Sequence, residues 1–391
     1  MKTKTKKTFI IIILIGITLG IIRICLLFLL PNNTMTVSFY GIDLNTQTAI
    51  EQIISDMAET ENLTEKISYN TIDANKELHE KLLKKSDIII TEHGQTTALI
   101  AQHATKIDDA IFNNFPQTVK HTGIYKDQAF AIPLAIDHFE VAYNNAMLKK
   151  FNAGEPIRSI NQLEAFAQFA KEHEPLSGYP FVVAGGNDKH LFLFISALTE
   201  ALFGIEEYNT LWTHLQNADI ESASSILNNV FNYIHTWETD GLIHPEWKHV
   251  TNDKVLSFIE LEKPAIIFVP LSFHRTIPTD NISAYSASWM PCLQNVSNRS
   301  LILPTIIVSP VSENTNAETI VKALANQSIQ ATISENTKLA PPHSTAQALD
   351  KQASDVRLWA AASDKALPSI ENAFATKEAA ASFANWVRSN Y

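Results

Sequence analysis

Short apolar runs alternate with amphipathic segments along the chain that follows the amino-terminal segment. Residues 36–40 alternate branched and aromatic side chains with polar ones, as strands do, and residues 46–57 place isoleucines at helical spacing. Residues 66–72 predict a second strand, residues 77–83 a helix, and the apolar run at 87–91 a buried strand. This β-α-β-α-β order predicts an α/β protein with a parallel sheet and right-handed crossovers.

The remainder of the 391-residue chain continues this alternation. Extended runs are expected at residues 179–184, 265–269 and 301–308. Helices are expected at residues 96–103, 160–171, 191–203, 223–238, 255–261, 317–329, 344–353 and 373–387. The sequence has no internal repeat and no long low-complexity linker, and a chain of this length usually divides into more than one core. We therefore expect two lobes whose parts are interleaved along the sequence.

The amino terminus joins a lysine-rich segment to a long apolar run. Residues 9–30 are apolar enough, and at about 1.5 Å per residue long enough, to cross a bilayer as a helix. The lysines in residues 1–8 are expected to stay cytoplasmic. Since no small-residue cleavage site follows, we predict an uncleaved anchor. A lipoprotein acylated at Cys25, although Arg23 stands where a small residue is preferred, and a cleaved signal are the alternatives; all three export the body.

Charge and composition narrow the class of function. The first 30 residues hold five of the 30 basic side chains and none of the 41 acidic ones, which leaves 25 against 41, a formal charge of −16. Such a surface repels nucleic acid, so no nucleic-acid partner is expected. Two cysteines exclude a disulfide framework. The 13 histidines form no metal-binding pair, and no nucleophile motif occurs, so we predict neither metal, cofactor nor enzymatic activity.

Four segments resemble, in order and spacing, the extracellular solute-binding proteins of bacterial ABC importers, family 1 or sugar-type. These segments are residues 131–151, 156–167, 258–273 and 357–359. The first pairs an extended stretch beginning at Pro133 with a Tyr143-Asn144 step that leads into a helix, which suits a crossing between lobes. The family's turn glycine in the third segment, and its tryptophan after the strand at 265–269, are absent here.

The resemblance implies an α/β, two-lobed fold of the type II periplasmic-binding-protein kind. The apolar run adds one transmembrane helix before this fold, and such a membrane segment is unusual for the family. The expected boundaries are residues 1–8 for a cytoplasmic basic segment, 9–30 for the anchor, 35–135 for lobe 1, 136–300 for lobe 2, 301–335 for a return to lobe 1 and 336–391 for carboxy-terminal helices of lobe 2. Hinges are expected near residues 133–137, 301–303 and Ser334, where the chain crosses between the lobes.

In such a fold the ligand lies between the lobes, at the carboxyl ends of strands. Asp43 follows the first predicted strand, and Glu92 and His93 follow the strand at 87–91. Carboxylates at these positions can accept charge-assisted hydrogen bonds from sugar hydroxyls, although helix capping or a solvated loop charge explains them equally well. The resemblance implies an acidic sugar ligand at Asp137.

The second lobe is expected to contribute Asn187 and Asp188, which follow the Gly185-Gly186 turn. An ordinary glycine turn is the alternative interpretation. The aromatic candidates are Phe273, His274 and Trp359, with Trp289 as a weaker one. A flat ring can stack on the apolar face of a sugar, but core packing explains most aromatic side chains.

The resemblance, together with the exported acidic body, implies an extracytoplasmic, monomeric solute-binding protein that binds a small ligand, preferably a carbohydrate, and delivers it to an ABC permease in the inner membrane. A ligand that contacts both lobes only in the closed form favours closure. One alternative is a membrane-anchored sensor or scaffold with the same fold that no longer delivers solute. Another is an anchored glycan hydrolase that depends on Asp137. Sugars, polyamines and peptides use similar acidic and aromatic linings, so the ligand itself stays open.

Overall fold

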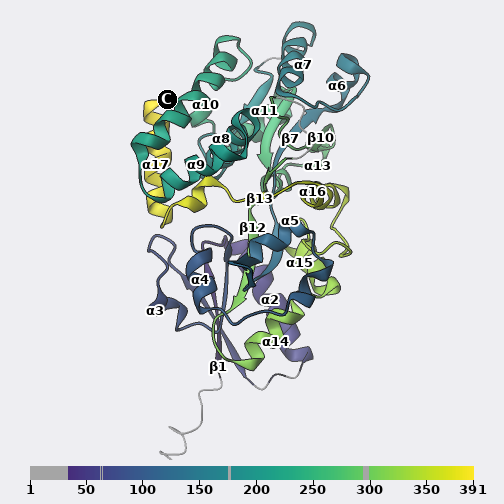
Figure 1. Ribbon diagram of the computed structural model, residues 1–391. Helices are drawn as coiled ribbons and strands as arrows, with labels where there is room; N and C mark the ends of the chain where they lie inside the picture. The colour runs from purple at the N-terminus through teal and green to yellow at the C-terminus, as the bar shows by residue number, and fades with distance from the viewer. Residues whose placement is uncertain (1–33, 62, 64, 175–177, 294–298) are drawn as a thin grey trace, which may run out of the picture.

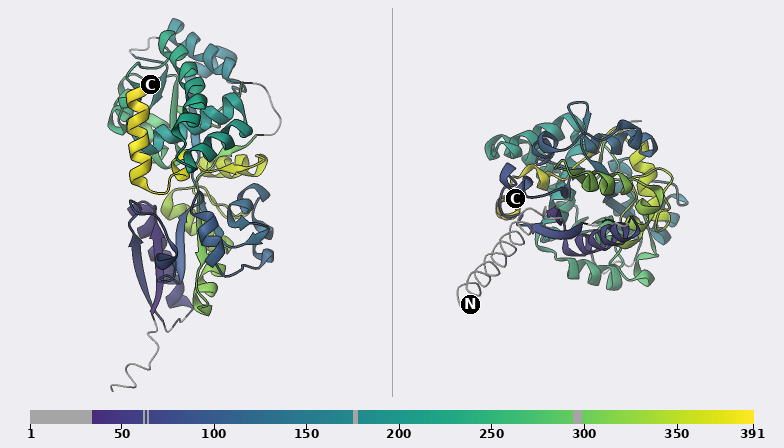
Figure 2. Two further views of the ribbon diagram at one scale, coloured as in Figure 1. Left: turned by 60° about the vertical axis from the view of Figure 1, so that its left-hand side comes forward. Right: turned by 90° about the horizontal axis from the view of Figure 1, so that it is seen from below.

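The computed structural model describes residues 34–391 except 62, 64, 175–177 and 294–298. The chain forms two lobes stacked end to end, each built on its own sheet (Figure 1). Seen from a second direction, the lobes meet at a waist where several chain segments pass (Figure 2). The anchor expected at residues 9–30 lies outside the described residues. Within the described ranges, no helix meets the length and apolarity that a membrane crossing requires.

Lobe 1, the lower one in Figure 1, contains a five-stranded sheet in the order β2-β1-β3-β12-β6. Its strands are β1 (Thr34–Tyr40), β2 (Lys66–Ile72), β3 (Ile88–Glu92), β6 (Ile132–Ile136) and β12 (Thr305–Pro310). The strand β1 pairs in parallel with β2 and β3, whereas β12 runs antiparallel to β3 and β6. The carboxyl ends of β1 and β3 therefore meet at one edge of the sheet.

Helices cover both faces of this sheet and bury its apolar side chains. They are α2 (Leu44–Thr60), α3 (Glu80–Leu83), α4 (Thr97–His103), α5 (Gln117–Lys120), α14 (Thr315–Ala323) and α15 (Gln327–Thr337). The helical spacing predicted for α2 is confirmed, because Ile50 and Ile54 are fully buried against Val37 and Phe39 of β1. A short hairpin of β4 (Ile124–Tyr125) and β5 (Gln128–Ala129) lies beside the sheet.

Lobe 2 contains a four-stranded sheet in the order β10-β7-β9-β8. Its strands are β7 (Phe139–Asn144), β8 (Phe181–Val183), β9 (Ile266–Pro270) and β10 (Tyr285–Ser288). Its helices are α6 (Asn145–Asn152), α7 (Ile160–His173), α8 (Asp188–Phe203), α9 (Ile205–Gln216), α10 (Ile220–Thr239), α11 (Asn252–Leu261), α12 (Leu271–His274), α13 (Thr279–Ile282) and α17 (Lys377–Asn390). Helix α8 is buried from His190 to Leu202, as expected for a core helix.

The chain passes between the lobes at the waist. It leaves β6 for β7 through Asp137 and His138, and it returns from β11 (Leu301–Ile302) to β12. A later segment runs from the end of α15 past Ala340, which pairs with Ile136, to α16 (Lys351–Ala362). Helix α16 packs on residues of both lobes, whereas we expected residues 336–391 within lobe 2.

The third expected hinge was misplaced. Ser334 lies inside α15, fully buried, and its hydroxyl donates a hydrogen bond of 2.7 Å to the carbonyl of Leu339. Helix α15 continues on both sides of Ser334, so the backbone there is fixed in helical conformation and does not form the crossing between lobes. The crossing instead follows Lys338, which ends α15 in a left-handed conformation with φ at +60°.

Most predicted elements occur, but some ends are wrong for local reasons. The run expected at 301–308 is divided into β11 and β12, because Pro304 between them has no backbone N–H to donate. The helix expected at 317–329 is two helices, and the Gln330 amide satisfies the freed carbonyl of Leu324 at the break, 2.8 Å away.

The last two helices also begin later than expected. The helix expected at 344–353 is wrong, because the Asp350 carboxylate accepts from the backbone N–H of Ala353 at 2.9 Å and sets the start of α16 at Lys351. The helix expected at 373–387 begins at Lys377, where Thr376 supplies the cap.

Candidate ligand site between the lobes

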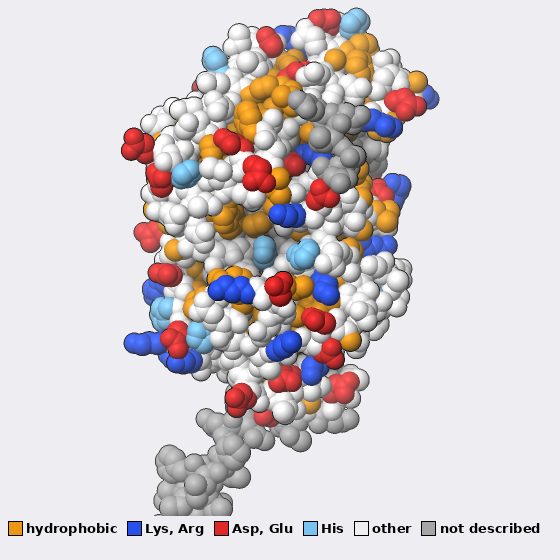
Figure 3. Space-filling view, in the orientation of Figure 1, with side chains coloured by type: hydrophobic (Ala, Val, Ile, Leu, Met, Phe, Trp, Pro, Cys, Tyr) orange, Lys and Arg blue, Asp and Glu red, His pale blue; other side chains and the backbone are white. Residues whose placement is uncertain are grey.

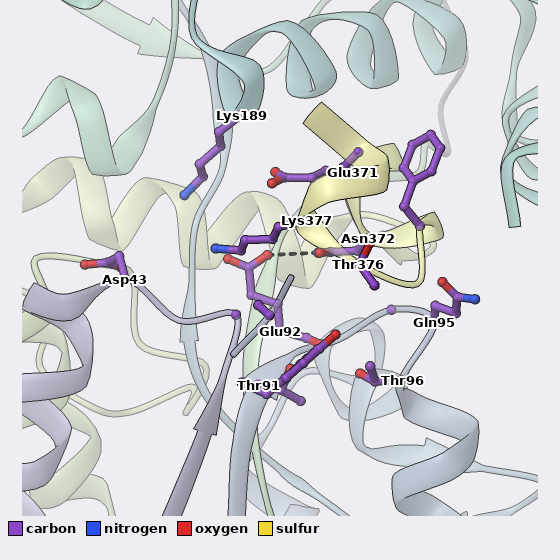
Figure 4. A pocket seen from close by; sticks show the side chains of 16 residues that line it. Asp43, Thr91, Glu92, Gln95, Thr96, Lys189, Glu371, Asn372, Thr376 and Lys377 are labelled. Carbon is purple, nitrogen blue, oxygen red and sulfur yellow. Dashed lines mark hydrogen bonds between the residues drawn. The ribbon is translucent and has the colours of Figure 1, made fainter. Parts of the chain in front are cut away.

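A cavity of about 170 Å³ lies where loops of the two lobes meet (Figure 4). Lobe 1 contributes residues at the carboxyl ends of β1 and β3, including Asp43 and Glu92. Lobe 2 contributes Lys189, in the first turn of α8, and residues of the segment that leads into α17. This edge of an open α/β sheet is where ligands commonly bind. Two of the residues predicted from the sequence are thus brought to one cavity.

On the lobe 1 side, the two predicted carboxylates differ in their surroundings. Asp43 caps α2 by accepting from the backbone N–H groups of Asn45 and Thr46 at 3.1 and 3.0 Å, and in Figure 4 its carboxylate points away from the other charged groups. The helix-cap interpretation of Asp43 therefore applies. One oxygen of Glu92 accepts from the Asn372 amide at 2.8 Å, which leaves its other oxygen open.

His93 does not line this cavity, although it follows Glu92 directly. Its backbone N–H donates to the carbonyl of Thr305 at 2.8 Å, which ties the end of β3 to β12. Burial lowers the pKa of His93 to about 4, so the ring is neutral at neutral pH. His93 thus contributes to the join between strands.

Lys189 is one of the two lysines that lobe 2 presents to the cavity, the other being Lys377. The Lys189 ammonium lies 2.9 Å from an oxygen of Asp137, and the two carry opposite charges. Burial alone would raise the pKa of Asp137, but the Lys189 charge and the hydrogen bonds from Ser272 outweigh it and hold that pKa below its usual value. Both groups are therefore ionised at neutral pH.

The structure gives Asp137 a different part from the one predicted. Its oxygens accept from the backbone N–H groups of His138 and Ser272, both at 3.0 Å, and from the Ser272 hydroxyl and Lys189 at 2.7 and 2.9 Å. An ionised carboxylate offers about four acceptor positions, and all of these are taken. Asp137 is 3 % exposed and has no acceptor position left for a sugar hydroxyl, so it acts by holding Lys189 in place.

The residues after the glycine turn also serve the fold. Asn187 caps α8 by accepting from the backbone N–H of His190 at 3.2 Å. Asp188 accepts from Arg388 of α17 at 2.7 Å and lies in a neighbouring depression. Gly185 is required there, because a Cβ atom would lie 2.6 Å from the carbonyl oxygen of Trp247. Lys189, which directly follows the predicted site residue Asp188, lines the cavity. That adjacency was the signal by which the sequence could have pointed to Lys189.

The predicted aromatic residues lie outside the cavity. Phe273 packs edge-on against His190 at 5.0 Å, and the Nδ1 atom of His274 lies 2.8 Å from a Glu140 carboxylate oxygen. Trp359 contacts the ring of His138 at 5.2 Å and that of Trp289 at 5.6 Å.

The two tryptophans line a separate cavity of about 450 Å³. For Phe273 and His274, packing within the protein is what the structure shows, as the alternative interpretation held.

Sequence reasoning missed the residues that lobe 2 supplies just before α17. Glu371, Asn372 and Lys377 all line the cavity. Burial raises the pKa of Glu371, and the nearby charge of Glu92 adds to this effect, while Lys377 and Lys189 oppose it. These residues belong to no recognisable motif. Asn372 contacts Glu92, yet the two are separated by 280 positions in the sequence. Only the folded chain brings them together.

The same segment joins the two lobes directly beside the cavity. The Tyr40 hydroxyl donates to the carbonyl of Ala375 at 3.1 Å. The backbone N–H of Gln95 donates to Asn372 at 3.0 Å, and that of Lys377 donates to Ala74 at 2.8 Å. We call residues 370–377 the bridging segment. On the surface, histidine and hydrophobic side chains gather at the level where the lobes meet (Figure 3).

Several solved structures of bacterial proteins share this architecture. The bacterial solute receptor AcbH, described as having an exclusive preference for β-D-galactopyranose, superposes with a TM-score of 0.68 at 12% identity over 91% of this chain and 96% of its own. The apo form of RafE from Streptococcus pneumoniae gives 0.65 at 11% identity, covering 92% and 93%. A sugar transporter component from Bacillus licheniformis, bound to stachyose, gives 0.60 at 14% identity, covering 91% and 99%.

No family model matches this sequence. No curated protein matches it either. The structural likenesses show that the chain has the two-lobed α/β fold of bacterial solute-binding proteins, and the resemblance inferred from the sequence is confirmed for the fold.

Proposed function

We propose that this chain is the extracytoplasmic solute-binding component of an ABC importer, binding a small carbohydrate between its lobes and delivering it to a permease. The observation that carries the proposal is the cavity between the lobes, to which each lobe contributes charged and amide side chains. Sugar hydroxyls both donate and accept hydrogen bonds, and ionised partners strengthen these bonds. The fold shared with sugar receptors supports the same proposal.

In this proposal, ligand binding and lobe closure are coupled through groups on opposite lobes. The open oxygen of Glu92 accepts from a sugar hydroxyl on the lobe 1 side, and Lys189 donates from the lobe 2 side. A ligand that contacts both groups gains the full interaction energy only when the lobes are together, so binding favours the closed form. Asp137 contributes indirectly, because it fixes the Lys189 ammonium where the ligand meets it.

The proposal is tested by titration calorimetry of the full-length, detergent-solubilised protein against monosaccharides and oligosaccharides. At least one sugar is expected to bind, and Glu92→Gln is expected to weaken that sugar about tenfold or more, because a hydrogen bond to a charged group contributes about 1.5–3 kcal/mol. Glu221→Gln, an exposed carboxylate on α10 outside the cavity, is the matched control and is expected to bind normally. Equal affinity in the wild type and Glu92→Gln would place the sugar elsewhere.

One observation favours the alternative of a sensor or scaffold. Hydrogen bonds between the protein's own groups join the lobes directly through the bridging segment. A protein that stays closed without solute would present a constant surface to a partner. Absence of binding heat for every sugar, together with a small-angle scattering profile that no sugar changes, would support this alternative over transport.

The cellular arrangement is also part of the proposal. A monomer held at the outer face of the inner membrane by the helix expected at residues 9–30 would keep the lobes beside the permease. The acidic body and the lysine-flanked apolar run support this arrangement. Mass spectrometry of the native amino terminus tests it: an intact Met1 is expected, whereas an acylated Cys25 would establish a lipoprotein instead.

A further inference from the structure

At the cavity, the negative charges outnumber the positive charges that are not already paired with another group. Figure 4 shows the carboxylates of Glu92 and Glu371 and the ammonium groups of Lys189 and Lys377 directed at the same space. Lys189 is already paired with Asp137 at 2.9 Å, outside the cavity wall. Lys377 is the other lysine at the cavity, and among the described residues no carboxylate lies within ion-pair distance of it. Glu92 and Glu371 therefore face one lysine without a close partner and one, Lys189, whose charge is already engaged by Asp137.

Glu371 is the carboxylate that lacks a partner. In the part of the chain that the structure describes, no donor or cation is recorded within hydrogen-bonding or ion-pair distance of its side-chain oxygens, whereas Glu92 receives the Asn372 amide at 2.8 Å. Its oxygens are not sealed in the interior and line the cavity. Burial and the neighbouring Glu92 both disfavour the charged form of this carboxylate. A cation placed between Glu371 and Glu92 would relieve both effects.

From this arrangement we infer that the cavity takes a saccharide carrying a free ammonium group, an amino sugar, in preference to the neutral sugar of the same shape. The ammonium lies between Glu371 of lobe 2 and Glu92 of lobe 1 and donates to both, while Lys189 donates to a ring hydroxyl. The inference rests on the proposed function, since it names the ligand class of the same site. Because the two carboxylates come from opposite lobes, the ammonium also holds the lobes together.

The test compares matched ligands by calorimetry on the full-length protein at neutral pH. The probes are glucosamine, glucose and N-acetylglucosamine, the same three forms in the galactose series, and the corresponding β-1,4-linked disaccharides. Acetylation keeps the nitrogen but removes its charge, so it separates charge from shape. The free amine is expected to bind about tenfold or more tightly than both of its neutral counterparts.

Glu371→Gln is expected to reduce this ratio severalfold, since it keeps the shape of the side chain and removes its charge, while Glu92 keeps part of the preference. Glu221→Gln, remote from the cavity, is expected to keep the wild-type ratio, and matching thermal melts establish that both variants fold. If neutral and amine forms bind equally in the wild type, the inference fails while the proposed function stands. If Glu371→Gln keeps the full wild-type ratio, the assignment to Glu371 is wrong. If no sugar of either kind binds, both the inference and the proposed function fail.

Discussion

At the scale of single residues, Asp137 holds Lys189 at the cavity wall because its four accepted hydrogen bonds favour the ionised form in a buried position. Removing the charge of Asp137 leaves Lys189 partly buried without its hydrogen-bonded carboxylate, with only the more distant charges of Glu92 and Glu371 nearby. The side chain of Lys189 is 37% exposed, so water screens part of this cost. The pair therefore stabilises less than a fully buried one.

Asp137→Asn is expected to lower the free energy of unfolding by about 2 kcal/mol, below the 3–5 kcal/mol typical of breaking a fully buried pair. Because the folded pKa of Asp137 lies below the unfolded value, this contribution is complete above about pH 4 and is lost as the pH falls further. Urea unfolding at pH 7 measures the effect, with Glu221→Gln as the control. A loss below about 0.5 kcal/mol, the range of ordinary surface changes, would show that the pair adds no stability.

His138 gives a second residue-scale prediction, based on pH. The ring is 2% exposed and packs on Trp359, and burial lowers its pKa to about 3, with Asp137 opposing this only in part. The unfolded chain takes up a proton at this histidine below about pH 6.5, whereas the folded protein does not until about pH 3. The unfolded state therefore binds more protons in this window, and the stability contributed by His138 falls as the pH is lowered.

His138→Phe is expected to remove this slope and to keep the packing on Trp359. Between pH 6 and pH 5, the variant should lose about 1 kcal/mol less unfolding free energy than the wild type. Urea unfolding at the two pH values gives the difference directly, and it cancels the titration of the other groups. Parallel pH dependences in the two proteins would mean that His138 is accessible to protons in the folded state.

At the scale of elements, the bridging segment lies between lobe 2, where Ile370 and Ala373 are fully buried, and the strand ends of lobe 1. Its contacts with lobe 1 are hydrogen bonds at the surface of the cavity, with little apolar burial. Each such bond contributes about 1 kcal/mol, so together they can set the balance between open and closed forms without fixing it permanently.

Tyr40→Phe combined with Asn372→Ala removes two of these bonds and is expected to open the ligand-free protein. Small-angle scattering should show a larger radius of gyration than for the wild type. Ser389→Ala, which removes a hydroxyl on the exposed face of α17, is the control and should scatter as the wild type does. An unchanged profile in the double variant would mean that other contacts keep the lobes together.

Most helices and strands could be predicted from the sequence, because the apolar patterns that indicate them are local. The parallel order of β1, β2 and β3 follows from alternating patterns and short helices, and the register of β1 with β2 runs through both strands. Prediction failed where a single capping side chain sets the start of a helix, as Asp350 does for α16. It also failed at the break between α14 and α15, where the side-chain amide of Gln330 donates to the carbonyl of Leu324. Neither contact leaves a periodic signal.

The site was predictable only on the lobe 1 side. Glu92, which lines the cavity, was a candidate because it follows a recognisable predicted strand, whereas Glu371 and Asn372 follow no strand and depend on the docking of the carboxy-terminal segment. The role of Asp137 was also hidden, since its partner Ser272 is 135 residues away in sequence. Local patterns place a residue near the junction of the lobes, but long-range contacts decide whether its side chain faces the cavity.

At the scale of the whole molecule, the two sheets are separate bodies that share a waist and enclose a charged cavity on one side of it. In the proposed mechanism the lobes rotate about the strand connections through Asp137 and before β12, and the hydrogen bonds of the bridging segment oppose their separation. A ligand that contacts Glu92 and Lys189 adds to the bridging contacts. The account therefore depends on a sugar lying between the lobes at these residues.

The most direct test is a crystal structure of the protein grown with the tightest-binding sugar from the calorimetric panel. The account predicts electron density for the sugar in the cavity between the lobes, within hydrogen-bonding distance of both Glu92 and Lys189. Density confined to another site, such as the separate cavity beside Trp289 and Trp359, or a fully occupied sugar that contacts one lobe alone, would contradict it.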